Sequence, residues 1–257
     1  MLHLEHYKQV QCIKLPLNRL IPHMSVYVYI VDNLMIDTGP KHAKKRLGRL
    51  IKDKNVNQAA ITHEHRDHCG TADWLAKKFA VTIYMNKANA RRSFFSCSKL
   101  HDLAKQYPKK IECTNHELIP VHTPGHTRDH TCLYEPNNGW LFAGDLYITS
   151  KPTVSLWSES VSKSIESLKT ILALDFDTLF CAHQGVVENG RQMLSEKLAY
   201  LETVQAQAVE LYNKGYSERA IAKILFPKKA RLERLTFGAF SSLHLVRQLI
   251  RAHNKRI

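Results

Sequence analysis

Short runs of apolar and β-branched residues alternate with amphipathic stretches over most of the chain. Strands are predicted at residues 25–32, 33–40, 58–62, 81–85, 117–127, 130–136, 139–148 and 177–185. Helical spacing of apolar residues predicts helices at 41–54, 71–80 and 161–175. Turns are predicted at Asp32-Asn33 and at Asn137-Asn138-Gly139, and the polar, basic segment 86–116 is expected to carry helices and a loop.

The pattern changes near residue 190, where strands stop and helical spacing takes over at 191–226 and 230–252. Gly215 is expected to end one helix, Ser217 to cap the next, and Pro227 to mark a further break. We therefore expect a catalytic domain over residues 1–190 and a helical C-terminal cap over 191–257.

Composition is that of a soluble globular protein, with 44% hydrophobic and 23% charged residues. The sequence has no run of roughly 20 apolar residues that would span a bilayer, and its first residues do not resemble a signal peptide. Six scattered cysteines without a CxxC pair indicate reduced thiols. These features predict a cytoplasmic protein with no membrane partner.

The net charge of +14 favours anionic partners, which could be acidic metabolites, nucleic acid or a membrane surface. Residues 196–257 carry 12 Lys and Arg against 5 Asp and Glu, so half of the excess lies in the tail. The favoured explanation of such a tail is a solvated face on packed helices.

Residues 63–68 read H-x-H-x-D-H and directly follow an apolar strand-like run. Imidazole and carboxylate groups are ligands that zinc and similar divalent ions accept. In an extended segment, residues two apart point to the same side, so His63 and His65 can grip one ion. Asp67 and His68 can face a second ion, and a solvated histidine-rich loop is the alternative. Further ligands are available at the ends of other strand-like runs: His126, Asp145 and His183.

Five motifs stand in the order found in the metallo-β-lactamase-fold hydrolases, which the first 190 or so residues resemble. They are IDTG with Asp37, THEHRDH with His63, His65, Asp67 and His68, TPGHT with His126, GDLY with Asp145, and AHQG with His183. The resemblance implies an α/β (α+β) fold, an αββα sandwich with a helical C-terminal extension. It also implies that His63, His65 and His126 hold one metal, that Asp67, His68 and His183 hold another, that Asp145 bridges them, and that Asp37 supports the site from behind.

Two positions depart from patterns in this superfamily. The last motif reads A-H-Q-G where many members have G-H-G, which would alter substrate access more than metal binding. His65 stands where flavodiiron members carry Glu, which disfavours reduction of O₂ or NO. His130, four residues after His126, is expected behind the ligands or facing the substrate. Cys69 is expected to be a small residue in a tight turn rather than a reactive thiol.

The resemblance further implies two divalent ions, with zinc favoured over iron or manganese, and a bridging hydroxide that attacks the substrate. Asp67 is the expected catalytic residue, since it can orient this nucleophile and accept its proton. The same machinery serves thioesters, lactones, amides and phosphodiesters.

The sequence layout is similar to the glyoxalase II-like branch, and the helical tail to the lactamase-B2-like hydrolases. A small, anionic acyl thioester or related acyl ester is therefore the leading substrate hypothesis. One alternative is a phosphodiesterase or ribonuclease, for which the basic tail and the helix at 41–54 would suit phosphate contacts. Another is a metal-bound regulatory or ligand-binding protein with little turnover. The sequence leaves open whether the chain is a monomer or a homodimer.

Overall fold

The computed structural model describes residues 3–18, 21–87, 97 and 100–254. The chain forms two compact units, each assembled from separate stretches of sequence. Unit 1 contains Met1–His122, Arg128–Ile148 and Asp175–Gly190, and unit 2 contains Thr123–Thr127, Thr149–Leu174 and Arg191–Ile257. The division into a catalytic domain ending at residue 190 and a helical cap stays a prediction.

Unit 1 contains two β-sheets. The seven-stranded sheet runs in chain order: β1 (His3–Tyr7), β2 (Val10–Asn18), β3 (Ile21–Val31), β4 (Leu34–Ile36), β5 (Gln58–Ile61), β6 (Thr82–Met85) and β7 (Lys105–Gln106). The six-stranded sheet has the order β14 (Gly185–Val187), β13 (Thr178–Cys181), β11 (Trp140–Gly144), β10 (Thr131–Glu135), β9 (Glu117–His122) and β8 (Ile111–Glu112). The pairs β4–β5 and β11–β13 are parallel.

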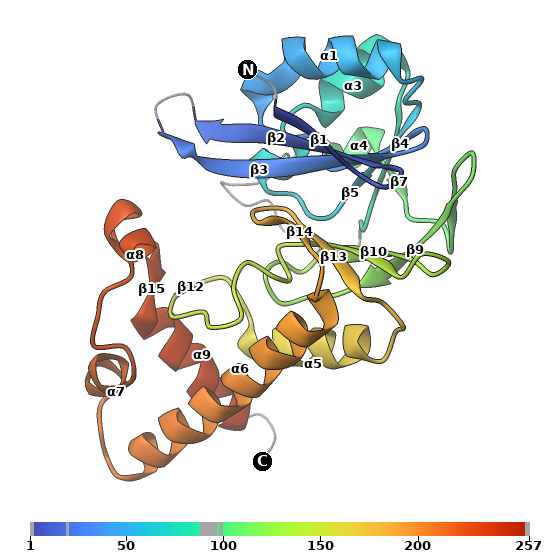
Figure 1. Cartoon of the computed structure of the whole chain (residues 1–257). Coiled ribbons are helices and arrows are strands. Elements are labelled where there is room, and N and C mark those ends of the chain that lie inside the picture. Colours follow the sequence, from blue (N-terminus) through green and yellow to red (C-terminus); the bar gives the residue numbers. More distant parts are fainter. Residues whose placement is uncertain (1–2, 19–20, 88–96, 98–99, 255–257) are drawn as a thin grey trace. The chain divides into compact units, whose positions relative to one another are not determined.

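The two sheets enclose one apolar core and the first sheet covers another. Tyr29 and Ile36 of the first sheet pack with Phe142 and Phe180 of the second between the sheets. The opposite face of the first sheet packs against η1 (Lys41–Ala43), α1 (Lys44–Asp53), α2 (Arg66–Cys69), α3 (Ala72–Phe79) and α4 (Leu100–Leu103). Unit 1 is therefore a helix–sheet–sheet arrangement, with α1 and α3 outside the first sheet (Figure 1).

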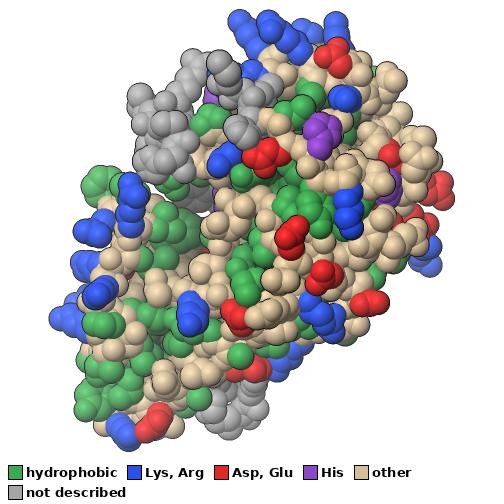
Figure 2. Space-filling model, in the orientation of Figure 1, with side chains coloured by type: hydrophobic (Ala, Val, Ile, Leu, Met, Phe, Trp, Pro, Cys, Tyr) green, Lys and Arg blue, Asp and Glu red, His purple; other side chains and the backbone are tan. Residues whose placement is uncertain are grey.

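Helix α1 follows directly from its sequence pattern. Leu47 and Ile51, one turn apart, are buried in the core under the helix. The opposite side exposes Lys45, Arg46 and Arg49, and Figure 2 shows Lys and Arg side chains gathered over this helix. Part of the positive charge predicted to attract anions therefore lies on unit 1.

Unit 2 contains α5 (Val161–Leu172), most of α6 (Gly190–Asn213), α7 (Glu218–Leu225), α8 (Arg231–Leu235), α9 (Ser242–Asn254) and a two-stranded sheet of β12 (Ser155–Leu156) and β15 (Phe240–Ser241). Ser217 caps α7 as predicted, because its side chain accepts a hydrogen bond from the Ala220 backbone N–H. Gly215 follows the end of α6 with a φ of +86°, which favours glycine. No helix in the described part of the chain has both the length and the apolar character needed to cross a bilayer.

Three features differ from the sequence predictions. The β1–β2 hairpin was not predicted, and the tail contains the short strand β15. The expectation of reduced cysteines is wrong for Cys69 and Cys97, which form a disulfide across 28 residues. Its Cα–Cα separation of 6.5 Å depends on tertiary proximity that sequence spacing does not reveal. The other cysteines of the described residues are thiols: Cys12, Cys113, Cys132 and Cys181.

A carboxylate joins the β3–β4 turn to the segment before β9. Asp32 accepts hydrogen bonds from the backbone N–H groups of Asn115, at 2.6 Å, and His116, at 3.1 Å, and from the His116 ring at 3.0 Å. Burial opposes the charged form, but the hydrogen bonds from His116 and Asn115 outweigh it and hold the pKa of Asp32 below its usual 3.8. The native state therefore favours the ionised carboxylate.

Asp32→Asn is expected to lower the unfolding free energy at pH 7 by about 1 kcal/mol, because charged acceptors form the stronger hydrogen bonds and solvent screens part of this gain. Since the folded pKa is depressed, this stability is present above about pH 4 and is lost as the pH falls through the folded pKa. Urea titrations of metal-free protein between pH 3 and pH 7 measure the difference, with Asp53→Asn on the exposed end of α1 as the control. A difference that stays constant with pH would contradict the role of the Asp32 charge.

Candidate metal centre

The candidate ligands of unit 1 lie just after the ends of strands. Asp37 follows β4 and His63 follows β5 by two residues, while Asp145 follows β11 and His183 follows β13 by two residues. Strands β4 and β5 are parallel, and so are β11 and β13, so the carboxyl ends of the two strands in each pair lie at the same edge of their sheet. Residues that follow strands of different sheets also meet, since Nε2 of His183 lies 3.8 Å from Oδ2 of Asp67 although the two are more than 100 residues apart in the sequence.

Two groups of potential ligand atoms meet at Asp145. His63, His65 and Asp145 offer atoms that all lie within 4.8 Å of one another, and so do Asp67, His68 and His183. Oδ2 of Asp145 is 3.9 Å from Nε2 of His63. Its Oδ1 is 3.4 Å from Nε2 of His68 and 3.3 Å from Nε2 of His183. The two oxygens of this carboxylate thus face different groups.

Asp37 fixes the orientation of His68 from behind. Its Oδ2 is 2.7 Å from Nδ1 of His68, and its carboxylate also accepts hydrogen bonds from the backbone N–H and the hydroxyl of Thr62. The Asp37 backbone has a φ of +58°, an uncommon conformation for a residue other than glycine. When the ring is neutral and Nδ1 donates to Asp37, the lone pair of His68 is carried by Nε2, which faces the other candidate ligands.

The same His68 nitrogen tests whether the residues suit a metal. Nε2 of His68 is buried and has no hydrogen-bond partner among the described residues, although carboxylate oxygens lie at 3.4 and 3.6 Å. A buried nitrogen with no hydrogen bond is costly unless another group satisfies it. A divalent cation held by imidazole and carboxylate groups would do so, and this donor set suits zinc, iron or manganese.

His183 is oriented by the backbone and by a buried thiol. Its Nδ1 is 2.9 Å from the carbonyl oxygen of Ser25, which leaves Nε2 toward Asp145 and Asp67. The thiol of Cys181 donates to the carbonyl oxygen of Tyr147 at 2.8 Å, and its sulfur accepts from the backbone N–H of His183 at 3.4 Å. The sequence does not reveal this role of Cys181, because only the fold brings Tyr147 to it.

His130 supports the backbone of Asp145. The Asp145 N–H donates to Nε2 of His130 at 3.1 Å, so the neutral ring carries its proton on Nδ1. Gly144 has a φ of +49°, and a Cβ there would lie 2.7 Å from Nε2 of His130. The glycine in the GDLY motif is therefore required both by its backbone conformation and by the close approach of His130.

His126 belongs to unit 2, within the segment Thr123–Thr127. Its Nδ1 is 2.9 Å from Oε1 of Glu159, a residue that belongs to none of the sequence motifs. The carboxylate suits a ring that donates from Nδ1 and presents Nε2 as a ligand. The role of His126 as a metal ligand stays a prediction.

Carboxylates raise the pKa values of two candidate ligands in the metal-free protein. Burial favours the neutral rings, but Asp145, Asp37 and Asp67 outweigh it and raise the pKa of His68 to about 10. Burial is likewise outweighed for His183, where Asp145 is the main cause of a pKa raised to about 9. An excess of negative charge therefore surrounds these rings, and cations are favoured there.

Comparison with known proteins agrees with this geometry. A family model for the metallo-beta-lactamase superfamily matches residues 21–183, which is more than half of the chain. The chain belongs to the metallo-β-lactamase superfamily. A beta-lactamase domain protein from Burkholderia ambifaria has a similar structure, with a TM-score of 0.68 at 17% identity over 94% of this chain and 86% of that one. The predicted metallo-β-lactamase fold is thereby confirmed.

The sequence is also similar to proteins whose names indicate a hydrolase or the β-lactamase-like fold. Hydroxyacylglutathione hydrolase of Citrobacter koseri is 31% identical over 188 residues, or 70% of each chain. The beta-lactamase-like protein 2 homolog of Drosophila melanogaster is 29% identical over 168 residues, which cover 60% of this chain and 56% of the fly protein. Together, the metallo-β-lactamase family match and these relatives support a metal-dependent hydrolase.

Proposed function

We propose that the chain hydrolyses an acyl thioester or a related acyl ester at a centre of two divalent ions, with zinc as the favoured metal. The observation that carries the proposal is the position of Asp145, whose two oxygens face separate histidine-containing groups. His63, His65 and His126 would hold one ion, Asp67, His68 and His183 would hold the other, and Asp145 would be shared between them.

When bound, the two ions supply Lewis-acid polarisation of an acyl oxygen and a water that ionises near neutral pH. Asp67 is the proposed catalytic residue, because its side chain is 29% exposed while those of Asp145 and Asp37 are 6% and 3% exposed. A carboxylate that is open to solvent can orient the attacking water and accept its proton. Asp37 and His130 are proposed to hold the ligands in place.

The thioester assignment is supported by the relative named hydroxyacylglutathione hydrolase, which covers 70% of this chain. The net charge of +14 supports an anionic small molecule as the substrate.

Asp67→Asn is expected to lower kcat on a thioester by at least about 100-fold, because the variant loses the proton acceptor. The assay follows thiol release from an S-acyl thioester by zinc-loaded protein, in parallel with an aryl phosphodiester. Asp53→Asn serves as the control for removal of a carboxylate charge, since Asp53 is exposed on α1.

Thioester turnover that Asp67→Asn abolishes and Asp53→Asn leaves intact would support the proposal. Turnover of the phosphodiester alone would contradict it and favour the nuclease alternative. Two tightly bound ions without turnover of either substrate would favour a ligand-binding role instead.

A further inference from the structure

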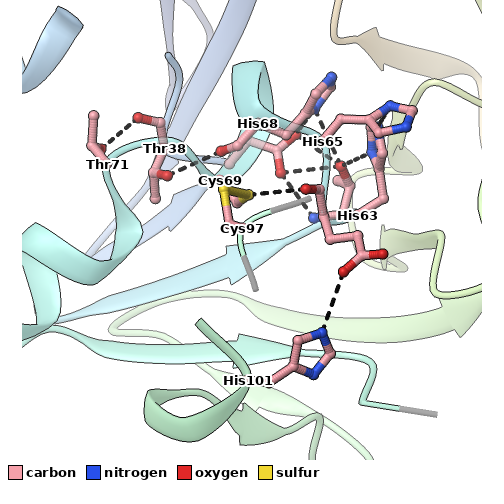
Figure 3. Close-up of a disulfide and its surroundings, with 11 residues drawn as sticks. Thr38, His63, His65, His68, Cys69, Thr71, Cys97 and His101 are labelled. Atoms are coloured by element: carbon pink, nitrogen blue, oxygen red, sulfur yellow. Dashed lines mark hydrogen bonds and ion pairs between the residues drawn. A yellow bond between two sulfur atoms is a disulfide. The ribbon is translucent and has the colours of Figure 1, made fainter. Parts of the chain in front are cut away.

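The Cys69–Cys97 disulfide is attached to the candidate metal loop at both of its ends (Figure 3). Cys69 is the last residue of α2 and directly follows His68. The backbone N–H of Cys97 donates to the carbonyl oxygen of Glu64 at 3.2 Å, and Glu64 lies between His63 and His65. The disulfide therefore joins the two halves of the H-x-H-x-D-H motif.

The two halves differ in how they are otherwise held. On one side, the backbone N–H and hydroxyl of Thr38 donate to the carbonyl oxygen of His68 at 2.6 and 3.0 Å. On the other side, the carbonyl oxygen of Glu64 accepts a hydrogen bond from the backbone N–H of Cys97, and Oε2 of its side chain lies 3.3 Å from Nε2 of His101. The two halves are also joined directly, because the carbonyl oxygen of His65 accepts hydrogen bonds from the backbone N–H groups of His68 and Cys69 at 2.9 and 3.0 Å, and Cys97 adds a further connection at Glu64.

The solvent exposure of the two cysteines determines which sulfur an external thiol would attack. Cys69 is 2% exposed, whereas Cys97 is partly exposed. In thiol–disulfide exchange the attacking thiolate must approach the sulfur directly, so access decides the point of attack. A thiol from solvent would therefore react at Cys97 and release Cys69.

The released Cys69 thiol has an acceptor already in place. Its Sγ lies 3.2 Å from the carbonyl oxygen of Glu64, an arrangement in which a reduced thiol donates a hydrogen bond. A buried polar group that keeps a partner avoids the cost of an unsatisfied donor. The surroundings of Cys69 therefore suit both the oxidised and the reduced state.

We propose that Cys69–Cys97 is an exchange site for small thiols, and that the disulfide strengthens the hold of the His63–His65 segment on its metal ion. A thiolate RS⁻ forms a bond to the sulfur of Cys97, the Cys97–Cys69 bond breaks, and its electron pair stays on the sulfur of Cys69, which takes a proton from water. Attack of the Cys69 thiolate on Cys97 reverses the step and releases RS⁻, so no further oxidant is consumed.

The class of thiol follows from the proposed function, on which this part of the inference rests. Hydrolysis of an acyl thioester releases a carboxylate and a free thiol. The reaction product would then be the reagent that opens the disulfide beside the metal loop. Exchange is expected to weaken zinc binding at the His63–His65 group by about tenfold, comparable to the loss of a group that orients a ligand.

The test incubates zinc-loaded protein with glutathione, blocks free thiols with an alkylating reagent and maps the peptides by mass spectrometry. We expect one glutathione on Cys97 and a free, alkylated Cys69. Cys97→Ser should take up no glutathione at this site. Cys69→Ser should keep glutathione on Cys97 after treatment with oxidised glutathione, because the resolving thiol is gone.

Competition with a chromophoric chelator should show about tenfold weaker zinc binding in Cys97→Ser than in the oxidised wild type.

Cys113→Ser is the matched control, since Cys113 is also only partly exposed and burial raises the pKa of its thiol to about 12. It should behave as the wild type. Free Cys69 and Cys97 in air-purified protein, no adduct on Cys97, or equal zinc affinity in oxidised wild type and Cys97→Ser would each overturn the inference. None of these measurements uses turnover. A failure of thioester hydrolysis alone would instead contradict the proposed function and the product as the source of the thiol.

Discussion

Asp145→Asn is expected to weaken zinc binding at both groups by more than about 100-fold. Mutation of a residue that only hydrogen-bonds to a metal ligand already lowers metal affinity by about 10- to 100-fold, and Asp145 is proposed to be a ligand itself. The cause is the shared position of this carboxylate, which lies within 4 Å of His63, His68 and His183. An amide of the same size removes the negative charge that two neighbouring cations require. Zinc content after dialysis against a weak chelator measures the effect, and thioester turnover should fall with it.

A second readout of Asp145→Asn needs no metal. Asp145 is the main group that raises the pKa of both His68, to about 10, and His183, to about 9. In metal-free protein the pKa of each ring should therefore fall in the variant, which NMR titration of the imidazole signals detects. Asp53→Asn should leave zinc content and both pKa values unchanged. Loss of zinc from one group alone would contradict a bridging role.

Asp37→Asn is expected to reduce zinc affinity at the Asp67–His68–His183 group by about 10- to 100-fold while the protein stays folded. Asn tolerates the φ of +58° at this position, and its amide oxygen can still accept from Thr62. The amide nitrogen then faces Nδ1 of His68, where the carboxylate oxygen lies at 2.7 Å. Two N–H donors cannot face each other, so His68 must place its proton on Nε2, the nitrogen proposed to bind metal.

The variant Asp37→Ala separates this effect from loss of the fold. It leaves the Thr62 and His68 donors without their acceptor and places alanine at a positive φ, so we expect a loss of about 3–5 kcal/mol of unfolding free energy. Nitrogen-15 NMR identifies the tautomer of His68 in Asp37→Asn, and chelator competition measures zinc. Wild-type zinc affinity with the proton on Nε2 would contradict the assignment of Nε2 as the ligand atom.

Elements that depend on interactions between residues close in the sequence could be predicted. Helix α1 was predicted because Leu47 and Ile51 recur at helical spacing, and both are buried. The cap at Ser217 and the glycine at Gly215 depend on backbone geometry within a few residues. The β1–β2 hairpin was missed. Cys12 and Ile13, adjacent on β2, lie in the cores on opposite faces of the first sheet, so the strand lacks the alternation that marks one with a solvated face.

The sequence by itself determined the kind of site, because the histidine and aspartate motifs and their positions after strands specify which donor atoms are available. Only the tertiary structure decided how those atoms are oriented. Asp37 behind His68, the Ser25 carbonyl behind His183 and the thiol of Cys181 act across 31, 158 and 34 residues. The Cys69–Cys97 disulfide likewise joins residues with no recognisable spacing. Such contacts depend on distances and angles set by packing of the whole unit, and a one-dimensional pattern carries no record of them.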